Sequence, residues 1–159
     1  MNPVGGCGAS GGPATIVRVD QFEVVVAAGT LRAGAGEVVP FRHRWTPDGV
    51  TVQAAFTGAH LLHLAVAGCV LNDVFREAEK NAVDIRGVRV TASGDFQAGT
   101  WVSTGIRYSV EVDSPASAEV LQELIATVDV VAEIPKAIRV GAEVVNAGPS
   151  QGTPHSQQG

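Results

Sequence analysis

The sequence is short of cysteine, has no run of basic residues and lacks a signal-peptide pattern, and each absence excludes a class of protein. Two cysteines, Cys7 and Cys69, are too few for a disulfide framework, and no clustered histidines accompany them to make a zinc site. The formal net charge is -5, so we expect no nucleic-acid partner. Residues 1–14 have neither a basic segment nor an apolar core, so we expect a cytoplasmic protein with reduced thiols.

The composition fits one domain with a well-formed core. The chain has 159 residues, of which 45% are hydrophobic and 17% are charged. Residues 1–14 and 146–159 are rich in Gly, Ser, Pro and Gln, which is typical of flexible tails. We therefore expect a single domain over residues 15–145, and no pattern in it predicts a cofactor or a bound metal.

An apolar stretch near the middle of the chain predicts a long helix over residues 59–82. Residues 59–71 carry no formal charge apart from two histidines, so this helix should be buried on nearly every side. The uncharged part falls short of the about 20 residues that a bilayer requires, which favours a core helix and no membrane partner. At ~1.5 Å per residue the helix spans roughly 36 Å, more than one small domain covers, so a partner subunit is expected.

Alternating apolar and polar residues predict strands before this helix. The valine-rich segment 15–28 suits one strand, and residues 37–45 suit a second, in which Pro40 indicates an edge position. Residues 46–49, Thr-Pro-Asp-Gly, predict a reverse turn, and the alternation resumes over residues 50–56. The two segments on either side of the turn should form a hairpin.

The second half of the chain predicts another hairpin, a helix and a last strand. Residues 88–93 and 106–113 alternate on either side of a turn. Ser114 followed by proline predicts the N-cap of an amphipathic helix over residues 115–131, and residues 138–145 suit a final strand. This order predicts an α+β fold with antiparallel sheets.

Three segments resemble the OsmC/Ohr superfamily, named for osmotically inducible and organic-hydroperoxide-resistance proteins. They are the helix motif Gly-Ala-His-Leu-Leu-His-Leu-Ala-Val-Ala-Gly-Cys at residues 58–69, the strand Val-Asp-Ile-Arg-Gly-Val-Arg-Val at 83–90, and Ile-Pro-Lys-Ala-Ile-Arg at 134–139. The resemblance implies an intertwined homodimer in which antiparallel sheets wrap around central helices. It also implies that the functional sites lie at the subunit interface.

The resemblance implies thiol chemistry for which this chain has only part of the family's residues. Family peroxidases use a reactive cysteine, a resolving cysteine and an arginine–glutamate pair that holds the thiolate. Cys69 matches the reactive cysteine, whereas the glutamate position falls on Ala59 and the resolving position on Ala132 or a neighbour. The family's two-cysteine cycle therefore cannot run here in its usual form, and an external thiol reductant is expected.

The candidate site residues around Cys69 also have ordinary structural interpretations. Cys69 itself could be a small buried hydrophobe. Asp73, one helical turn later, would raise the thiol pKa, and Arg76 would offset that effect. His60 and His63 share a helix side away from Cys69, so they suit core or pocket-lining positions unless a second chain brings them to its thiol.

Two arginines and the second cysteine complete the set of candidates. Arg42 and Arg44 lie on one face of a predicted strand; such a pair usually faces solvent, but one of them could supply the guanidinium that stabilises the Cys69 thiolate. Cys7, in a tail, could replace the missing resolving thiol or have no role.

Two functions from different classes are compatible with these residues. The first is an OsmC-like thiol protein that reduces organic hydroperoxides, or reacts with another electrophile, through Cys69. The second is a repurposed relative that binds an apolar small molecule at a dimer interface. A structural dimer whose thiol has no role is the third interpretation.

Overall fold

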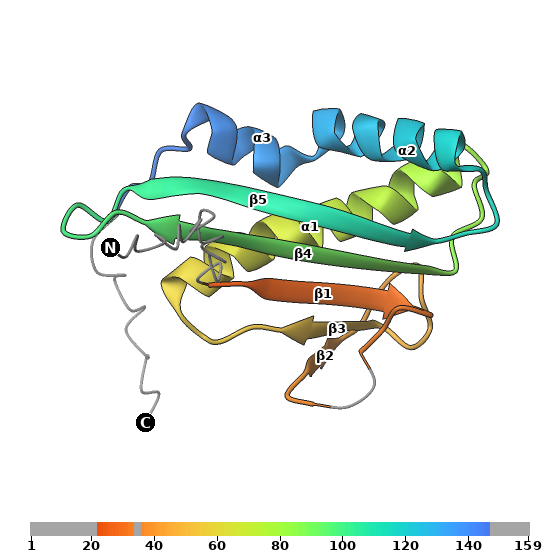
Figure 1. Ribbon diagram of the computed structural model, residues 1–159, viewed down its shortest axis with the longest axis horizontal. Coiled ribbons are helices and arrows are strands. Elements are labelled where there is room, and N and C mark those ends of the chain that lie inside the picture. Colours follow the sequence, from red (N-terminus) through yellow and green to blue (C-terminus); the bar gives the residue numbers. More distant parts are fainter. Residues whose placement is uncertain (1–21, 34–35, 147–159) are drawn as a thin grey trace, which may run out of the picture.

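The computed structural model describes residues 22–33 and 36–146. The tail predicted for residues 1–14, with Cys7, lies outside the described residues, as does nearly all of the tail predicted for residues 146–159. Eight elements follow one another along the described chain (Figure 1): β1 (Val24–Gly29), β2 (Val39–Phe41), β3 (Val50–Gln53), α1 (Gly58–Lys80), β4 (Gly87–Phe96), β5 (Ser103–Asp113), α2 (Ala118–Val131) and α3 (Glu133–Val140).

The five strands form one antiparallel sheet in the order β2-β3-β1-β4-β5. Val26 pairs with Val90, and Val90 pairs with Val110, so side chains of one parity line the same face of three strands. The helices lie on this face, with α1 running behind the sheet and α2 and α3 beside β5 (Figure 1). The α+β antiparallel class is confirmed, and Pro40 lies in the edge strand β2 as predicted.

Helix α1 begins where the sequence predicts. The Thr57 hydroxyl caps it by accepting a hydrogen bond of 3.4 Å from the His60 backbone N–H. One side of the helix is fully buried against β1 and β4, with Val70 and Val74 both 0% exposed. The expectation of burial on nearly every side is wrong for the single chain, because Ala65 and Asn72 are exposed on the other side.

Helix α1 also satisfies a length and hydropathy test for a membrane span. The core helices of soluble proteins pass the same test, and here the helix packs against the sheet and against α2 and α3. The contact with the sheet supports the prediction of a core helix.

The strands around the first turn are shorter than the alternation predicts. In the segment 37–45 only Val39–Phe41 is strand, and in the segment 50–56 only Val50–Gln53. The backbone leaves the sheet after Phe41 because the Thr46 hydroxyl bonds both the His43 ring and the Gly49 carbonyl. This turn directs Trp45 toward α1, where its indole N–H donates to Glu79 at 3.0 Å. Beyond β3, Phe56 is 91% exposed.

Two predictions for the C-terminal part are wrong. The N-cap of α2 is Ser117, which accepts from the Val120 N–H, whereas Ser114 donates to the Asp84 carbonyl. The strand predicted over residues 138–145 is instead the helix α3, followed by residues without regular structure. Pro135 falls in the first turn of α3, where a proline costs no helical hydrogen bond, so the helix begins before it.

Gly94 permits a close approach between the sheet and α1. A Cβ at this position would lie 2.4 Å from the Gly105 carbonyl oxygen and 3.0 Å from the His63 ring. The pairing of β4 with β5 also shifts register between Gly94 and Phe96. A side chain here would force apart two strands and the start of α1.

We therefore expect Gly94→Ala to lower the free energy of unfolding by about 1–3 kcal/mol, as overpacking usually does. Urea unfolding followed by circular dichroism measures the change. Gly58→Ala is the matched control, since a Cβ at Gly58 meets nothing within 4 Å. Equal stability of the two variants would show that the contact at Gly94 relaxes without cost.

Candidate functional site

Cys69 lies on α1 at the edge of a cavity of about 500 Å³. The thiol is free and partly exposed. Three elements contribute the lining: α1, the turn before β3, and the start of α3. The lining residues are Trp45, Ala65, Cys69, Asn72, Asp73, Arg76, Glu133 and Ile134.

Two carboxylates flank the thiol. The Cys69 Sγ lies 3.8 Å from both Asp73 Oδ2 and Glu133 Oε2, so either carboxylate can accept its single proton in a hydrogen bond. Asp73 is one helical turn along α1 and is 3% exposed, whereas Glu133 is exposed and comes from the first residue of α3. The fold thus brings a carboxylate from 64 residues away to the sulfur predicted from the helix motif.

Arg76 connects the two carboxylates. Its Nη1 lies 3.0 Å from Asp73 Oδ1 and 3.1 Å from Glu133 Oε1, and its Nε lies 3.1 Å from Glu77 Oε1. The guanidinium is therefore shared among three acidic groups. An arginine–glutamate pair does stand beside Cys69, but it is formed by Arg76 and Glu133, at positions that the helix motif does not predict.

The start of α3 also faces the sulfur. This helix has no side-chain N-cap, so the N–H groups of its first turn are free to bond another acceptor. The backbone N–H groups of Ile134 and Glu133 bond the Cys69 sulfur and act to lower the thiol pKa. A helix N-terminus favours an anion, so this contact stabilises a thiolate.

The pKa of Cys69 is nevertheless raised above its ordinary value. Burial of the thiol is the largest cause, and the negative charges of Asp73 and Glu133 add to it. The predicted effect of Asp73 on the thiol therefore has the expected direction, and Arg76 does not reverse it. At neutral pH the thiol holds its proton in most molecules.

The two carboxylates are shifted in opposite directions. Burial raises the pKa of Asp73, against the opposing charge of Arg76. The pKa of Glu133 is lowered, first by its own backbone N–H and then by its hydrogen bond with Arg76. Asp73 is thus the more basic group beside the thiol, and Glu133 stays ionised.

The same three groups are close enough to share a metal ion. The ligand atoms of Cys69, Asp73 and Glu133 lie within 4.8 Å of one another. Arg76 already pairs with both carboxylates, however, and its positive charge would oppose the binding of a metal cation beside it. The arrangement suits proton transfer at a sulfur better than metal binding.

The two histidines lie at the start of α1, away from this cavity. His60 Nδ1 is 2.7 Å from Thr57 Oγ1, and its ring meets the edge of Phe22. His63 is 0% exposed, its Nδ1 lies 2.7 Å from the Phe22 carbonyl oxygen, and its ring stacks on Phe96. Because Nδ1 donates to that carbonyl, the neutral ring carries its lone pair on Nε2, for which the described residues offer no partner.

Neither candidate arginine of β2 and its turn lines the cavity. Arg42 is exposed, and the Arg44 guanidinium stacks over Trp45 at 5.3 Å from the ring centroid. Arg44 therefore contacts Trp45, which lines the cavity, but does not line the cavity itself. The site residues that sequence reasoning missed are Trp45, Ala65, Asn72, Glu133 and Ile134. Only the Ile-Pro segment of the family resemblance includes one of them, Ile134.

The position predicted for a resolving cysteine is also well defined. Ala132 joins α2 to α3 and is 0% exposed. Since alanine stands there, the described part of the chain places no second thiol beside Cys69.

Comparisons with solved structures give low sequence identities. An OsmC-like protein from Mycoplasma pneumoniae is 14% identical over 67% of this chain and 88% of its own, with a TM-score of 0.49. An OsmC-like hydroperoxide resistance protein from Jannaschia sp. CCS1 is 16% identical over 83% and 96%, with a TM-score of 0.44. A protein assigned to organic hydroperoxide resistance from Vibrio cholerae, with captopril in one active site, is 20% identical over 73% and 84%, at 0.39.

The family is established by sequence. No curated protein matches the chain at a significant level. A sequence model described as OsmC-like protein matches residues 51–145, which is more than half of the chain and includes α1, the β4–β5 hairpin and both C-terminal helices. The chain therefore belongs to the OsmC-like family, within the OsmC/Ohr superfamily indicated by its helix motif.

Proposed function

We propose that the protein is a thiol-dependent enzyme of the OsmC type that reduces organic hydroperoxides, or a related electrophile, through Cys69. The observation that carries the proposal is the thiol held between two carboxylates of opposite pKa shift, at the mouth of a cavity of about 500 Å³. Pairs of titratable groups whose environments separate their pKa values are typical of acid–base sites.

Asp73 is the group that moves the proton. Its raised pKa lets it accept the thiol proton and later return it, whereas Glu133 remains ionised and holds Arg76 in place. The N–H groups at the start of α3 hold the thiolate that results. The thiol is therefore deprotonated during the reaction with substrate, and the enzyme without substrate holds Cys69 mainly as the protonated thiol.

The reaction follows from these roles. The Cys69 thiolate attacks one oxygen of the hydroperoxide, and an S–O bond forms as the O–O bond breaks. The sulfur is oxidised by two electrons to a sulfenic acid, and the peroxide is reduced to an alkoxide. Protonated Asp73 gives its proton to the alkoxide, which leaves as an alcohol.

Turnover requires an external thiol. One molecule of thiol condenses with the sulfenic acid, releasing water and leaving a mixed disulfide on Cys69. A second molecule attacks the reductant sulfur of that disulfide, so that the two reductant molecules leave joined as a disulfide and the Cys69 thiol is freed. Alanine at position 132 is the reason for assigning this step to an outside reductant.

One observation favours the second candidate function, an apolar ligand site without catalysis. The raised pKa of the Cys69 thiol disfavours the nucleophilic form at neutral pH. In that case the cavity beside Trp45 and Ile134 binds a small apolar molecule and Cys69 is part of its wall. Reactivity of Cys69 toward a hydroperoxide separates the two functions.

We also propose that two copies associate through the exposed side of α1. Leu61, Ala65 and Asn72 form a stripe along the helix, and Leu61 is 39% exposed. Partly exposed Cys69 lies in the same stripe, so a second chain would close the cavity from the open side. An exposed, uncharged stripe of this length on a long central helix suits an interface.

Exposure to an organic hydroperoxide should oxidise Cys69. We expect cumene hydroperoxide with dimedone present to give a dimedone adduct at Cys69, identified by mass spectrometry of the peptide. Cys69→Ser should abolish hydroperoxide consumption, and Cys7→Ser should preserve it when an external dithiol is supplied. An unmodified Cys69 after full exposure would refute the catalytic proposal and favour the binding role.

Asp73→Asn should change the rates of two reactions of the Cys69 thiol in opposite directions. Removing a negative charge beside Cys69 lowers its pKa, so alkylation by iodoacetamide at pH 7 should become faster. Reduction of cumene hydroperoxide should become slower by about tenfold or more, because its alkoxide leaving group needs a proton and iodide does not. Stopped-flow rates measure both, with Glu123→Gln on the exposed side of α2 as control. Parallel changes in the two rates would exclude Asp73 as the proton donor.

Light scattering at micromolar concentration should give the mass of a dimer. Ala65→Glu would place an unpaired charge in the stripe, so we expect the dissociation constant of the dimer to rise by about tenfold or more. Val144→Glu, at a position 94% exposed near the C-terminal end of the described chain, is the control. A monomeric wild-type protein would contradict the proposed interface.

A further inference from the structure

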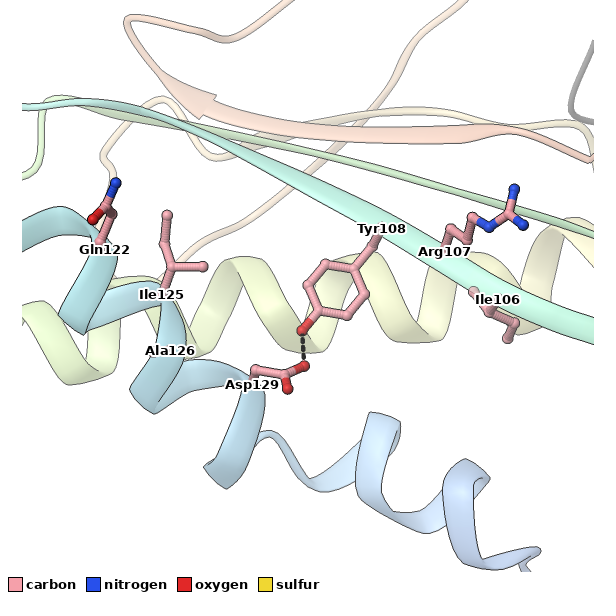
Figure 2. A pocket seen from close by; sticks show the side chains of 7 residues that line it. All are labelled: Ile106, Arg107, Tyr108, Gln122, Ile125, Ala126 and Asp129. Atoms are coloured by element: carbon pink, nitrogen blue, oxygen red, sulfur yellow. Dashed lines mark hydrogen bonds between the residues drawn. The ribbon is translucent and has the colours of Figure 1, made fainter. Parts of the chain in front are cut away.

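Three side chains from three elements meet outside the Cys69 cavity. Tyr108 of β5 donates its phenol O–H to Asp129 Oδ1 of α2, and Arg139 of α3 bonds the same oxygen at 2.6 Å. Arg139 also donates to the Asp129 backbone carbonyl at 3.0 Å. We call Tyr108, Asp129 and Arg139 the α3 clamp. Figure 2 shows Tyr108 reaching from β5 to Asp129, with α3 continuing beyond it.

The clamp crosses a gap in the packing. A groove of about 660 Å³ lies between β5 and α2, with Ile106 and Ile125 among its walls (Figure 2). Direct packing between these two elements is therefore incomplete at this end. The bonds to Asp129 are what tie β5, α2 and α3 to one another across the groove.

Apart from the clamp, helix α3 is held by Glu133, which pairs with Arg76 of α1 at 3.1 Å, and by two residues that pack inward. It follows α2 after the single residue Ala132, and Pro135 is its only buried residue, with Ile138 partly buried against the core. Its first turn carries Glu133 and Ile134 to the Cys69 cavity, and its last turn carries Arg139 to the clamp. Because this helix has only eight residues, we expect a change at its last turn to shift its first turn.

We propose that the α3 clamp sets the size of molecule that reaches Cys69, by holding the first turn of α3 against the cavity. The inference rests on the proposed function, in that Cys69 is the reacting group. Tyr108, Asp129 and Arg139 are positioning residues, since they act on the site through α3. The substrate class is thus small or slender electrophiles, and bulky ones are admitted only when α3 swings outward.

The clamp keeps its charge state across the physiological range. Burial, and then the hydrogen bond to Asp129, raises the pKa of Tyr108 to about 12, and the pKa of Asp129 is lowered by its bonds to Tyr108 and Arg139. The phenol therefore remains a donor and the carboxylate an acceptor. The size limit should not change between pH 6 and pH 9.

The ratio of two alkylation rates tests the proposal. Iodoacetamide is small and a pyrene maleimide is bulky, and both react with the thiolate. Their rate ratio at one pH cancels the thiolate fraction and reports access alone. In Arg139→Gln we expect the maleimide-to-iodoacetamide ratio to rise about two- to fivefold. Loss of a half-exposed ion pair should raise the fraction of molecules in which α3 has moved outward by about this factor.

Matched variants make the test specific. Tyr108→Phe removes only the hydroxyl and should raise the rate ratio less than Arg139→Gln. Arg139→Lys keeps the positive charge, so its rate ratio should lie between those of the wild type and Arg139→Gln. Arg107→Gln, an exposed arginine next to Tyr108 on β5, should leave the ratio unchanged. Rates are measured on Cys7→Ser protein, at urea concentrations far below the unfolding midpoint of each variant, so that Cys69 reacts from folded protein.

The outcome decides the proposal without any peroxide. A ratio that stays at the wild-type value in both Tyr108→Phe and Arg139→Gln overturns it, as does an equal rise in Arg107→Gln. If Arg139→Gln does not fold, the comparison of Tyr108→Phe with Arg107→Gln decides alone. Failure of Cys69 to reduce hydroperoxide would refute the proposed function and leave this ratio measurable.

Discussion

One side of α1 is packed against the valine-lined face of the sheet, and the rest of the molecule is arranged around this contact. Val70 and Val74 on the helix and Val88 and Val90 on β4 are all 0% exposed. Burial of apolar surface is the main favourable term in folding, so this contact fixes the distance of α1 from the sheet and its rotation about its own axis. The rotation in turn determines which residues of the helix are left on its open side, and Cys69 is one of them.

The rotation of α1 buries the carboxylate of Asp73, and Arg76 on the same helix compensates for its charge. Packing places Asp73 in a nearly buried position one turn from the thiol, and a buried carboxylate needs a partner. Arg76 pairs with it at 3.0 Å and with Glu133 at 3.1 Å, so the ion pairs link the start of α3 to α1. The thiol lies within this network. The contact between α1 and the start of α3 places both carboxylates and the backbone N–H groups beside the sulfur.

Much of the fold could be predicted because it depends on local patterns. The long helix, the β4–β5 hairpin and the edge position of Pro40 all follow from residues near one another in the chain. The errors arise where a distant contact decides between local alternatives. Residues 138–145 alternate like a strand, yet they begin as helix because Ile138 packs against the core next to α1 and the sheet.

The residues along the chain were enough to predict the family and the central helix and to single out Cys69 as a candidate, because the apolar pattern and the helix motif lie in one continuous stretch. The groups around the sulfur follow from the folding of distant segments. Glu133 and Trp45 reach the Cys69 cavity through a helix junction and a turn whose directions are set by side-chain hydrogen bonds and packing. A carboxylate from 64 residues away lies 3.8 Å from the sulfur, and no spacing along the chain encodes that distance.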